Sequence, residues 1–301
     1  MAAQLDQPLG ELCLQRAVNL AEAKHVANRV KGLVDSGEAK SGVGKVAVSH
    51  GEGGRVLIAG LGDPAEAWQP QLEGLADRYR ITAFDNPGAA RTPLPEGPLS
   101  SSTMADDAAA LLRALEVQSA HVAGFSMGSA IAQELALRHP QLVDSLVLVS
   151  TYARPDPLFR SQLNFWRWLP EAAPSERAFF EAFFTWVYTP RAHADGTVDQ
   201  FVEEALAFPH QQSVEAFQAQ VEVCLTHDTA DRLSQIAAPT LVLSGELDVI
   251  LPPRFGRAVA AEIPNARFEV MGGEAHQPFQ EIPDEFNARV DAFWREAEAR
   301  G

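Results

Sequence analysis

From about residue 45 onward, short apolar runs alternate with longer segments in which apolar residues recur every three or four positions. The short runs predict strands, and they read KVAVSH, RVLIAG, RITAFD, HVAGF, SLVLVS, PTLVLSG and ARFEVM. The longer segments predict helices, and they read WQPQLEGLADRY, TMADDAAALLRALEV, SAIAQELALRHP, PPRFGRAVAAEI and DEFNARVDAFWREAEA. Such alternation is typical of an α/β protein with a mostly parallel, doubly wound sheet.

The first 44 residues differ from the rest of the chain. The lysines all lie between Lys24 and Lys45, and no aromatic residue precedes Trp68. Apolar residues at three- and four-residue steps predict one helix here, and they are Leu20, Ala23, Ala27, Val30 and Leu33. We therefore expect an N-terminal helical extension over residues 1–44. Its apolar side would cover either its own domain or a second copy of the chain in a homodimer.

Composition and charge narrow the class of protein. The chain has 301 residues, 46% of them hydrophobic, which is enough for a full core. A formal net charge of -16 would repel nucleic acid and anionic membranes. Cys13 and Cys224 form no CxxC pair, and no apolar stretch reaches the length of a membrane span or a signal peptide. We expect a cytoplasmic protein without a structural metal.

One short motif carries candidate chemistry. Gly124, Ser126 and Gly128 form GxSxG at the junction of the predicted strand HVAGF and the helix that follows it. In a nucleophile elbow, the serine lies on a strained strand-to-helix turn, and small residues on both sides let strand and helix approach closely. The motif therefore predicts a nucleophilic serine at position 126. A tight turn without chemistry is the alternative.

A nucleophilic serine needs a base and an acid that orients the base. Asp248 follows the predicted strand PTLVLSG, and His276 follows the predicted strand ARFEVM. The order Ser126, Asp248, His276 is the order that this kind of elbow predicts. His276 is the only histidine after the last predicted strand, whereas His121 and His139 have positions typical of structural residues.

With these three motifs in place, residues 45 to 297 resemble an α/β-hydrolase of the group that contains enol-lactonases, esterases, carbon-carbon bond hydrolases and cofactor-free haloperoxidases. The resemblance rests on GFSMGS, SGELDVILP and GGEAHQPF. It implies that Ser126 is the nucleophile, His276 the general base and acid, and Asp248 the orienting carboxylate. It also implies an oxyanion hole made by the backbone N–H groups of Leu61 and Met127, and no cofactor.

The sequence departs from the pattern of this family at three places. Ala59 precedes Gly60 where many relatives have His-Gly, so a side chain that braces the oxyanion loop is absent. The loop after RITAF reads Asp-Asn-Pro-Gly-Ala-Ala over residues 85–90, where relatives usually have Asp-x-Arg-Gly-x-Gly. Only one strand, KVAVSH, is visible before the oxyanion strand, where relatives have two.

The resemblance divides the chain into a hydrolase core over residues 45–151 and 233–301 and an inserted helical cap over residues 152–232. Aromatic residues gather in the cap, and some of them should line the pocket while others attach the cap to the core. The pocket candidates are Phe125, Phe165, Trp166, Trp168, Phe183, Phe184 and Trp186. His193, His210 and His227 have no metal-ligand spacing, and we expect them on the surface.

These observations predict a serine hydrolase that cleaves a carboxylic ester or lactone of a small, largely hydrophobic metabolite through an acyl-enzyme. Two other functions use the same residues. One is a non-hydrolytic lyase, cyclase or carbon-carbon cleaving enzyme of a natural-product or catabolic pathway, in which His276 removes a proton from the substrate. The other is a ligand-binding protein without turnover.

Overall fold

The computed structural model describes residues 46–48 and 52–300. The predicted helical extension over residues 1–44, and a dimer contact through it, lie outside the described residues. No helix in the described part of the chain is long and apolar enough to cross a membrane.

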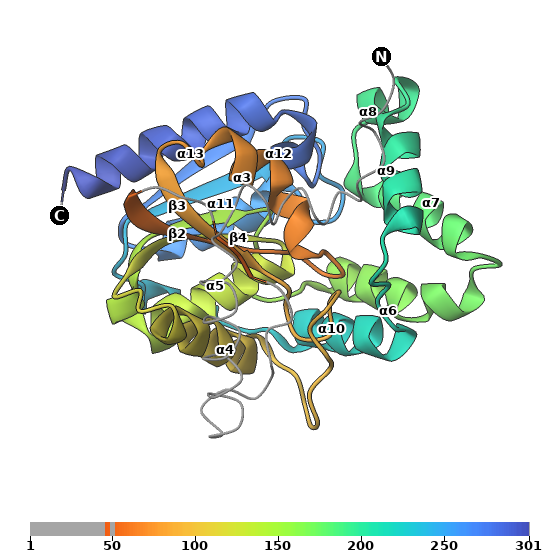
Figure 1. Ribbon diagram of the computed structural model, residues 1–301, viewed down its shortest axis with the longest axis horizontal. Helices are drawn as coiled ribbons and strands as arrows, with labels where there is room; N and C mark the ends of the chain where they lie inside the picture. Colours follow the sequence, from red (N-terminus) through yellow and green to blue (C-terminus); the bar gives the residue numbers. More distant parts are fainter. Residues whose placement is uncertain (1–45, 49–51, 301) are drawn as a thin grey trace, which may run out of the picture.

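Seven strands form one sheet in the order β1-β3-β2-β4-β5-β6-β7 (Figure 1). β1 pairs antiparallel with β3, and the other neighbouring strands pair in parallel, which confirms the predicted mostly parallel sheet. Within the described residues one strand precedes β2, as the sequence indicated. The strands are β1 (Val46–Val48), β2 (Glu52–Ile58), β3 (Tyr79–Phe84), β4 (Ala120–Phe125), β5 (Val143–Val149), β6 (Thr240–Gly245) and β7 (Ala266–Met271).

The path of the chain through the sheet determines where a site can form. From β2 the chain passes to β3 on one side, and it then returns to β4 on the other side of β2. In open α/β sheets, ligands bind beyond the carboxyl ends of the strands at such a switch point. The loops that follow β2 and β4 therefore meet where a ligand is expected.

Helices cover both faces of the sheet (Figure 1). On one face, Ile58 of β2 and Val242 of β6 share a buried cluster with α4, α5 and α11. On the other face, Leu57 and Leu243 share a cluster with η1 and α13. The core helices are α3 (Gln69–Gly74), α4 (Ser101–Ala114), α5 (Met127–Arg138), α11 (Pro253–Glu262), α12 (Pro278–Glu281) and α13 (Pro283–Glu298), with the short 3-10 helices η1 (Ala65–Trp68), η2 (Pro140–Leu142) and η3 (Leu233–Gln235).

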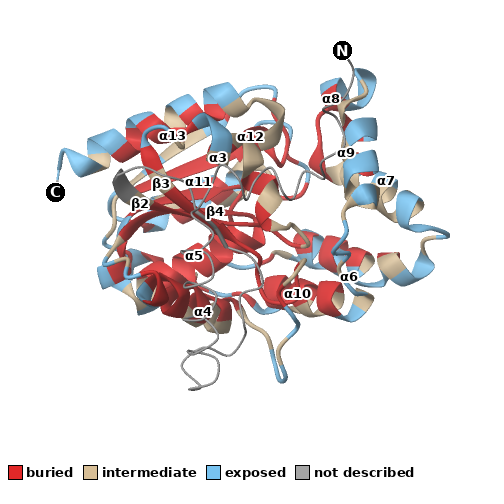
Figure 2. Cartoon of the chain, viewed as in Figure 1, coloured by how far each residue is buried: buried red, intermediate tan, exposed pale blue. Residues whose placement is uncertain are grey.

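The segment between β5 and β6 is helical, and it is the segment that the resemblance assigns to a cap. Side chains of Asp156, Ser175, Thr189 and Ser213 each accept a backbone N–H three residues later, so each caps the start of a helix. Figure 2 shows many exposed residues on α7 and α9, whereas the strands are mostly buried. The cap helices are α6 (Pro157–Ala172), α7 (Glu176–Val187), α8 (Pro190–Ala194), α9 (Thr197–Ala207) and α10 (Val214–Thr226).

Candidate active site

The GxSxG motif forms a strained turn between β4 and α5. Ser126 has φ 52° and ψ -116°, a backbone conformation that residues other than glycine rarely adopt. A Cβ on Gly124 would lie 2.3 Å from the Gly128 carbonyl oxygen, and a Cβ on Gly128 would lie 2.1 Å from the Ile58 carbonyl oxygen. Both positions therefore require glycine, and the turn carries the serine to the carboxyl end of the sheet.

The structure brings the three predicted catalytic residues together. Ser126 Oγ lies 3.1 Å from His276 Nε2, and His276 Nδ1 lies 2.8 Å from Asp248 Oδ2. All three side chains are buried. The serine follows β4, the aspartate follows β6 and the histidine follows β7, so three separate strand ends supply one hydrogen-bonded chain. This is the arrangement of a nucleophile, a base and the acid that orients the base.

The carboxylate of Asp248 is held in its charged form. Burial alone would raise its pKa, but the adjacent His276 imidazole and the N–H groups of Leu251 and Ile250 outweigh burial and lower the pKa below the ordinary value. Both N–H groups donate to Oδ1 at 2.9 Å, which leaves Oδ2 facing the imidazole. An ionised Asp248 can stabilise the imidazolium that forms when His276 accepts a proton.

The two predicted oxyanion donors lie on either side of the β2–β4 switch point. Met127 is the first residue of α5, so its N–H belongs to the first turn, where amides have no intrahelical acceptor. Leu61 lies on the loop after β2 and lines the same cavity as Ser126. The role of these amides as an oxyanion hole stays a prediction.

The loop after β3 braces the oxyanion loop, which lacks the histidine of many relatives. Asn86 Nδ2 donates to the Ala59 carbonyl at 2.9 Å, and Asp85 Oδ1 accepts the Ala65 N–H at 2.8 Å. From the cap, Gln220 accepts the Gly62 N–H at 2.9 Å. The oxyanion loop and residues 85–90 both depart from the pattern of the family, and these hydrogen bonds connect them.

A small cavity of about 30 Å³ lies beside Ser126 and His276. Four of the predicted pocket residues line it: Phe125, Trp166, Phe183 and Phe184. The remaining lining residues were not predicted as pocket residues, and they are Leu61, Asp63, Phe159, Leu163, Val187, Cys224, Ile250 and Gln277. One wall of the cavity is thus mostly aromatic and aliphatic, while Asp63 and Gln277 add polar groups near the histidine.

The other three pocket candidates, Phe165, Trp168 and Trp186, do not line this cavity. The cavity residues of α6 are Phe159, Leu163 and Trp166, which share one face at steps of four and three residues. Phe165 and Trp168 project from another side of α6, where Trp168 is 49% exposed and their rings contact each other. Trp186 packs against the rings of Phe165 and Trp166. The helical spacing was a signal that could have identified Phe159 and Leu163.

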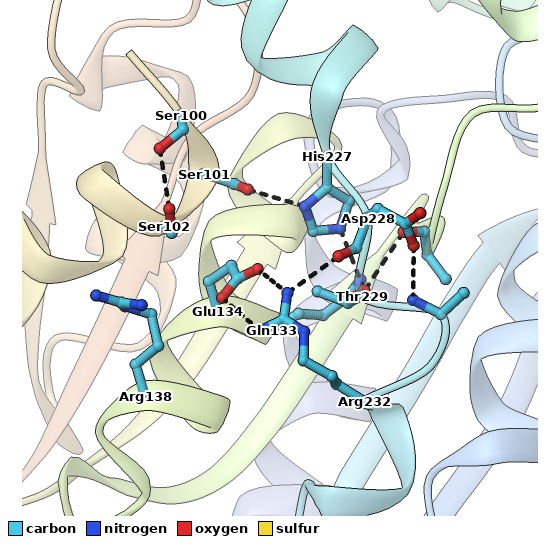
Figure 3. A network of polar contacts seen from close by, with 12 residues as sticks. Ser100, Ser101, Ser102, Gln133, Glu134, Arg138, His227, Asp228, Thr229 and Arg232 are labelled. Atoms are coloured by element: carbon cyan, nitrogen blue, oxygen red, sulfur yellow. Dashed lines mark hydrogen bonds and ion pairs between the residues drawn. The ribbon is translucent and has the colours of Figure 1, made fainter. Parts of the chain in front are cut away.

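The prediction that His227 lies on the surface is wrong. His227 follows α10 and is buried, and its Nδ1 lies 2.9 Å from the Ser101 hydroxyl at the start of α4 (Figure 3). Its Nε2 lies 3.4 Å from the Thr229 hydroxyl. Burial lowers its pKa to about 3. His193 and His210 are exposed as predicted, and no group of His, Cys, Asp or Glu in the described residues could hold a metal ion.

Comparison with known proteins assigns this chain to a family. A sequence model described as "alpha/beta hydrolase fold" matches residues 56–281. The chain belongs to the α/β-hydrolase fold family. The match spans both β2 and the His276 loop, so it includes every strand end that contributes to the site.

One similar sequence and two similar structures cover most of this chain. A protein of Azorhizobium caulinodans, provisionally named carbamate hydrolase RutD, is 34% identical over 245 residues, which cover 81% of this chain and 92% of that protein. The structure of a protein provisionally named non-heme bromoperoxidase BpoC, from Mycobacterium tuberculosis H37Rv, has a TM-score of 0.76 at 27% identity and covers 84% of this chain and 96% of that chain. The enol-lactonase of Burkholderia xenovorans LB400, with a TM-score of 0.73 at 24% identity, shares the fold over 83% of this chain and 96% of that chain.

Proposed function

We propose that this chain is a serine hydrolase that cleaves a carboxylic ester or lactone of a small, largely hydrophobic metabolite through an acyl-enzyme. The observation that carries the proposal is the hydrogen-bonded chain from Ser126 Oγ through the His276 imidazole to Asp248, at 3.1 and 2.8 Å. This chain ends at a cavity, so a bound carbonyl group can reach the serine hydroxyl. Membership of the α/β-hydrolase family supports the same class of reaction.

The reaction follows from the positions of these groups. His276 Nε2 takes the Ser126 hydroxyl proton while Oγ attacks the carbonyl carbon. The oxyanion that forms accepts hydrogen bonds from the N–H groups of Leu61 and Met127. Each such donor is worth about 3 kcal/mol of transition-state stabilisation. The tetrahedral intermediate collapses as His276 returns the proton to the leaving alcohol. Water activated by the same imidazole then releases the acid and regenerates Ser126.

The cavity supports a compact substrate. Its volume of about 30 Å³ is about two to three times the ~10–15 Å³ that one water molecule needs. The aromatic and aliphatic residues that line it favour an apolar group. We therefore propose that the acyl part of the substrate is short. A longer acyl chain would require the cap residues Phe183 and Phe184 to move.

Carbamate hydrolysis is a second candidate, because several similar sequences have names that assign this activity, the first at 34% identity. A carbamate presents the same electrophilic carbonyl, and Ser126 would form a carbamoyl-enzyme. The products separate the two candidates, since an ester yields an alcohol and an acid, whereas an unsubstituted carbamate yields ammonia as well. Ammonia release measured beside ester hydrolysis, with Ser126→Ala as the control, would distinguish them.

The direct test of the proposal is acyl-enzyme trapping. The protein is mixed with 4-nitrophenyl acetate and quenched in acid within the first turnover, and the acetylated peptide is identified by mass spectrometry. We expect acetyl on the peptide that contains Ser126, a burst of nitrophenol, and neither in Ser126→Ala. Steady hydrolysis without a trapped acyl group, at the same level in Ser126→Ala, would contradict the mechanism. Conversion of an ester-free substrate without uptake of water would favour the lyase or cyclase alternative.

A further inference from the structure

Asp63 is a carboxyl group in the cavity that the triad does not use. It lies on the oxyanion loop, two residues after Leu61, and it lines the cavity together with Ser126 and His276. Most of the other cavity residues are apolar. A carboxyl group in such surroundings is costly when charged unless a partner compensates it.

Two buried carboxylates of this protein are compensated by arginines, whereas Asp63 is partly buried. Asp85 pairs with Arg91 at 3.2 Å, and the buried Glu274 side chain pairs with Arg191 at 2.9 Å. Asp63, by contrast, has no arginine or lysine in an ion pair within the part of the chain that the structure describes. A protonated His276 imidazole would lower the pKa of Asp63, which burial otherwise raises.

Asp63 has two protein donors. Gln277 Nε2 donates to its Oδ2 at 3.2 Å, and the Gly60 N–H also donates to the carboxyl group. A carboxylate can accept about four hydrogen bonds. Two donors from the described residues therefore leave acceptor capacity at a group that borders the cavity, and a substrate in the cavity is placed to use it.

We propose that Asp63 is a specificity-determining residue whose carboxylate accepts a hydrogen bond from an O–H or N–H group that the substrate carries next to the carbonyl attacked by Ser126. The substrate class is then a small acyl compound with a hydroxyl, amine or amide N–H beside the carbonyl group. This inference rests on the proposed serine hydrolase function. It adds a polar requirement to a cavity that is otherwise suited to an apolar group.

The ionisation of Asp63 gives this role a pH signature. Burial raises its pKa from 3.8 to about 7, against the opposing effects of His276, the Gly60 N–H and Gln277. Tyr188 also lies near Asp63, and it in turn lies near Glu281 and Glu204, while Cys224 lines the same cavity. Above about pH 7 the ionised carboxylate accepts from a donor, so preference for donor-bearing substrates should grow between pH 6 and pH 8.5.

The competing explanation is a structural one, in which Asp63 only braces the oxyanion loop through Gly60 and Gln277. The variant Asp63→Asn keeps the size of the side chain and an oxygen acceptor, but it removes the charge. A bracing role predicts that Asp63→Asn lowers kcat/KM for all substrates by the same factor. A specificity role predicts a change in the ratio between substrates and the loss of the pH dependence of that ratio.

The test compares three phenyl esters that differ in one group beside the carbonyl. Phenyl glycolate carries a hydroxyl, phenyl propionate carries a methyl group of similar size, and phenyl glycinate carries an amino group that is mostly uncharged above about pH 8. At pH 8.5 we expect the wild type to prefer glycolate over propionate in kcat/KM by about tenfold to a hundredfold, the range of a hydrogen bond to a charged group. Asp63→Asn, whose amide oxygen accepts only a weaker, uncharged hydrogen bond, should lower this ratio by about fivefold to tenfold, while Asp106→Asn, at a partly exposed carboxylate on α4, should leave it unchanged.

Three results would overturn the proposal: a wild-type ratio near unity, a ratio that Asp63→Asn leaves intact, or a loss that is equal for all three esters. A response of glycinate alone, confined to pH values below about 7 at which its amine is protonated, would assign the effect to charge and would also overturn the assignment of a hydrogen-bond donor.

Equilibrium binding separates this proposal from the hydrolase proposal. Ligand-observed NMR compares glycolamide with propionamide on Ser126→Ala and on Ser126→Ala/Asp63→Asn, where no chemistry occurs. Tighter binding of glycolamide that depends on Asp63 supports the role of Asp63 even if the wild type hydrolyses no ester. Equal binding of the two amides in both variants overturns it. Absence of ester hydrolysis in the wild type would count against the proposed function alone.

Discussion

Among the buried serine–histidine pairs that the structure describes, Ser126–His276 and Ser101–His227 differ in their surroundings, and only the first has those of a catalytic site. Ser101 Oγ lies 2.9 Å from His227 Nδ1, which is closer than the 3.1 Å between Ser126 Oγ and His276 Nε2. The distance between hydroxyl and imidazole therefore does not distinguish a nucleophile from a structural contact. The difference lies in what surrounds each pair.

Three features separate the pairs. The second nitrogen of His276 faces the ionised Asp248 at 2.8 Å, whereas the second nitrogen of His227 lies 3.4 Å from the Thr229 hydroxyl. Ser126 has a strained backbone on a turn at the carboxyl end of β4, whereas Ser101 is the first residue of α4. The cavity borders Ser126 and His276, and neither member of the other pair lines it.

The second pair has a structural position. His227 follows the last cap helix, α10, and Ser101 begins α4 of the core, so their hydrogen bond joins cap and core (Figure 3). The Thr229 hydroxyl donates to Gln133 of α5, and the nearby Arg232 pairs with Glu134. The comparison shows that a triad needs an oriented base, a reactive turn and an accessible cavity together.

Replacing each serine with alanine should give the largest difference in kcat between the two pairs. We expect Ser126→Ala to lower kcat by about 10⁴-fold or more, because the nucleophile is lost. Ser101→Ala should change kcat by less than about threefold, while it destabilises the fold by about 1–3 kcal/mol, since it leaves a buried imidazole nitrogen without its partner. Ester hydrolysis and chemical unfolding measured on both variants test this. Comparable losses of activity in the two variants would mean that the pairs are not functionally distinct.

The acidic partners should show the next largest contrast. Asp248→Asn removes the charge that orients His276, and loss of such a carboxylate lowers kcat by about 10⁴-fold in a well-studied serine protease. We expect a decrease of about 10³ to 10⁴-fold here, by the same reasoning. The matched control is Asp228→Asn, beside His227, which should alter kcat by less than about twofold, within the usual effect of a surface change. A strong effect of Asp228→Asn would contradict the assignment.

The oxyanion loop should give a smaller effect. Asn86→Ala removes the hydrogen bond from Nδ2 to the Ala59 carbonyl, which positions the residues just before Leu61. We expect kcat to decrease by about tenfold, the equivalent of ~1.4 kcal/mol, with a smaller change in KM, because the donor acts mainly on the transition state. Steady-state kinetics with a short ester measure both constants. An unchanged kcat would mean that Asn86 does not position the loop.

The pH dependence of stability should show the smallest effect and should report on His227. Burial lowers the pKa of His227 from 6.5 to about 3, so the unfolded chain binds more protons than the folded protein between these values. The stability that the folded protein gains from keeping His227 neutral is therefore fully present above pH 6.5, and it is lost as the pH falls toward 3. We expect the free energy of unfolding of His227→Gln to fall less steeply than that of the wild type between pH 7 and pH 4.5. Parallel curves for the two proteins would contradict the buried, neutral state of His227.

The sequence alone predicted much of the site because each triad residue follows a strand that its apolar pattern reveals. Ser126, Asp248 and His276 then converge because parallel strands end at the same edge of a sheet. The turn at Gly124 and Gly128 was also predictable, since close approach of strand and helix requires small residues there.

Other features depend on packing that the sequence pattern does not encode. Asp63 and Gln277 lie on loops, where periodicity says nothing about the direction of a side chain. The burial of His227 depends on how the cap meets α4, which a local pattern cannot give. The aromatic composition of α6 made Phe165 and Trp168 pocket candidates, whereas Phe159 and Leu163 share the helix face of Trp166 and line the cavity.

The most direct test of the account is the intact mass of the protein after exposure to a fluorophosphonate probe, for the wild type, Ser126→Ala, His276→Ala and Ser101→Ala. We predict one adduct on the wild type and on Ser101→Ala, and none on Ser126→Ala or His276→Ala. This result would assign the activated hydroxyl to Ser126 and its activation to His276. An adduct that persists in folded Ser126→Ala, or none on a folded wild type whose cavity admits the probe, would contradict the central claim that Ser126 is the nucleophile.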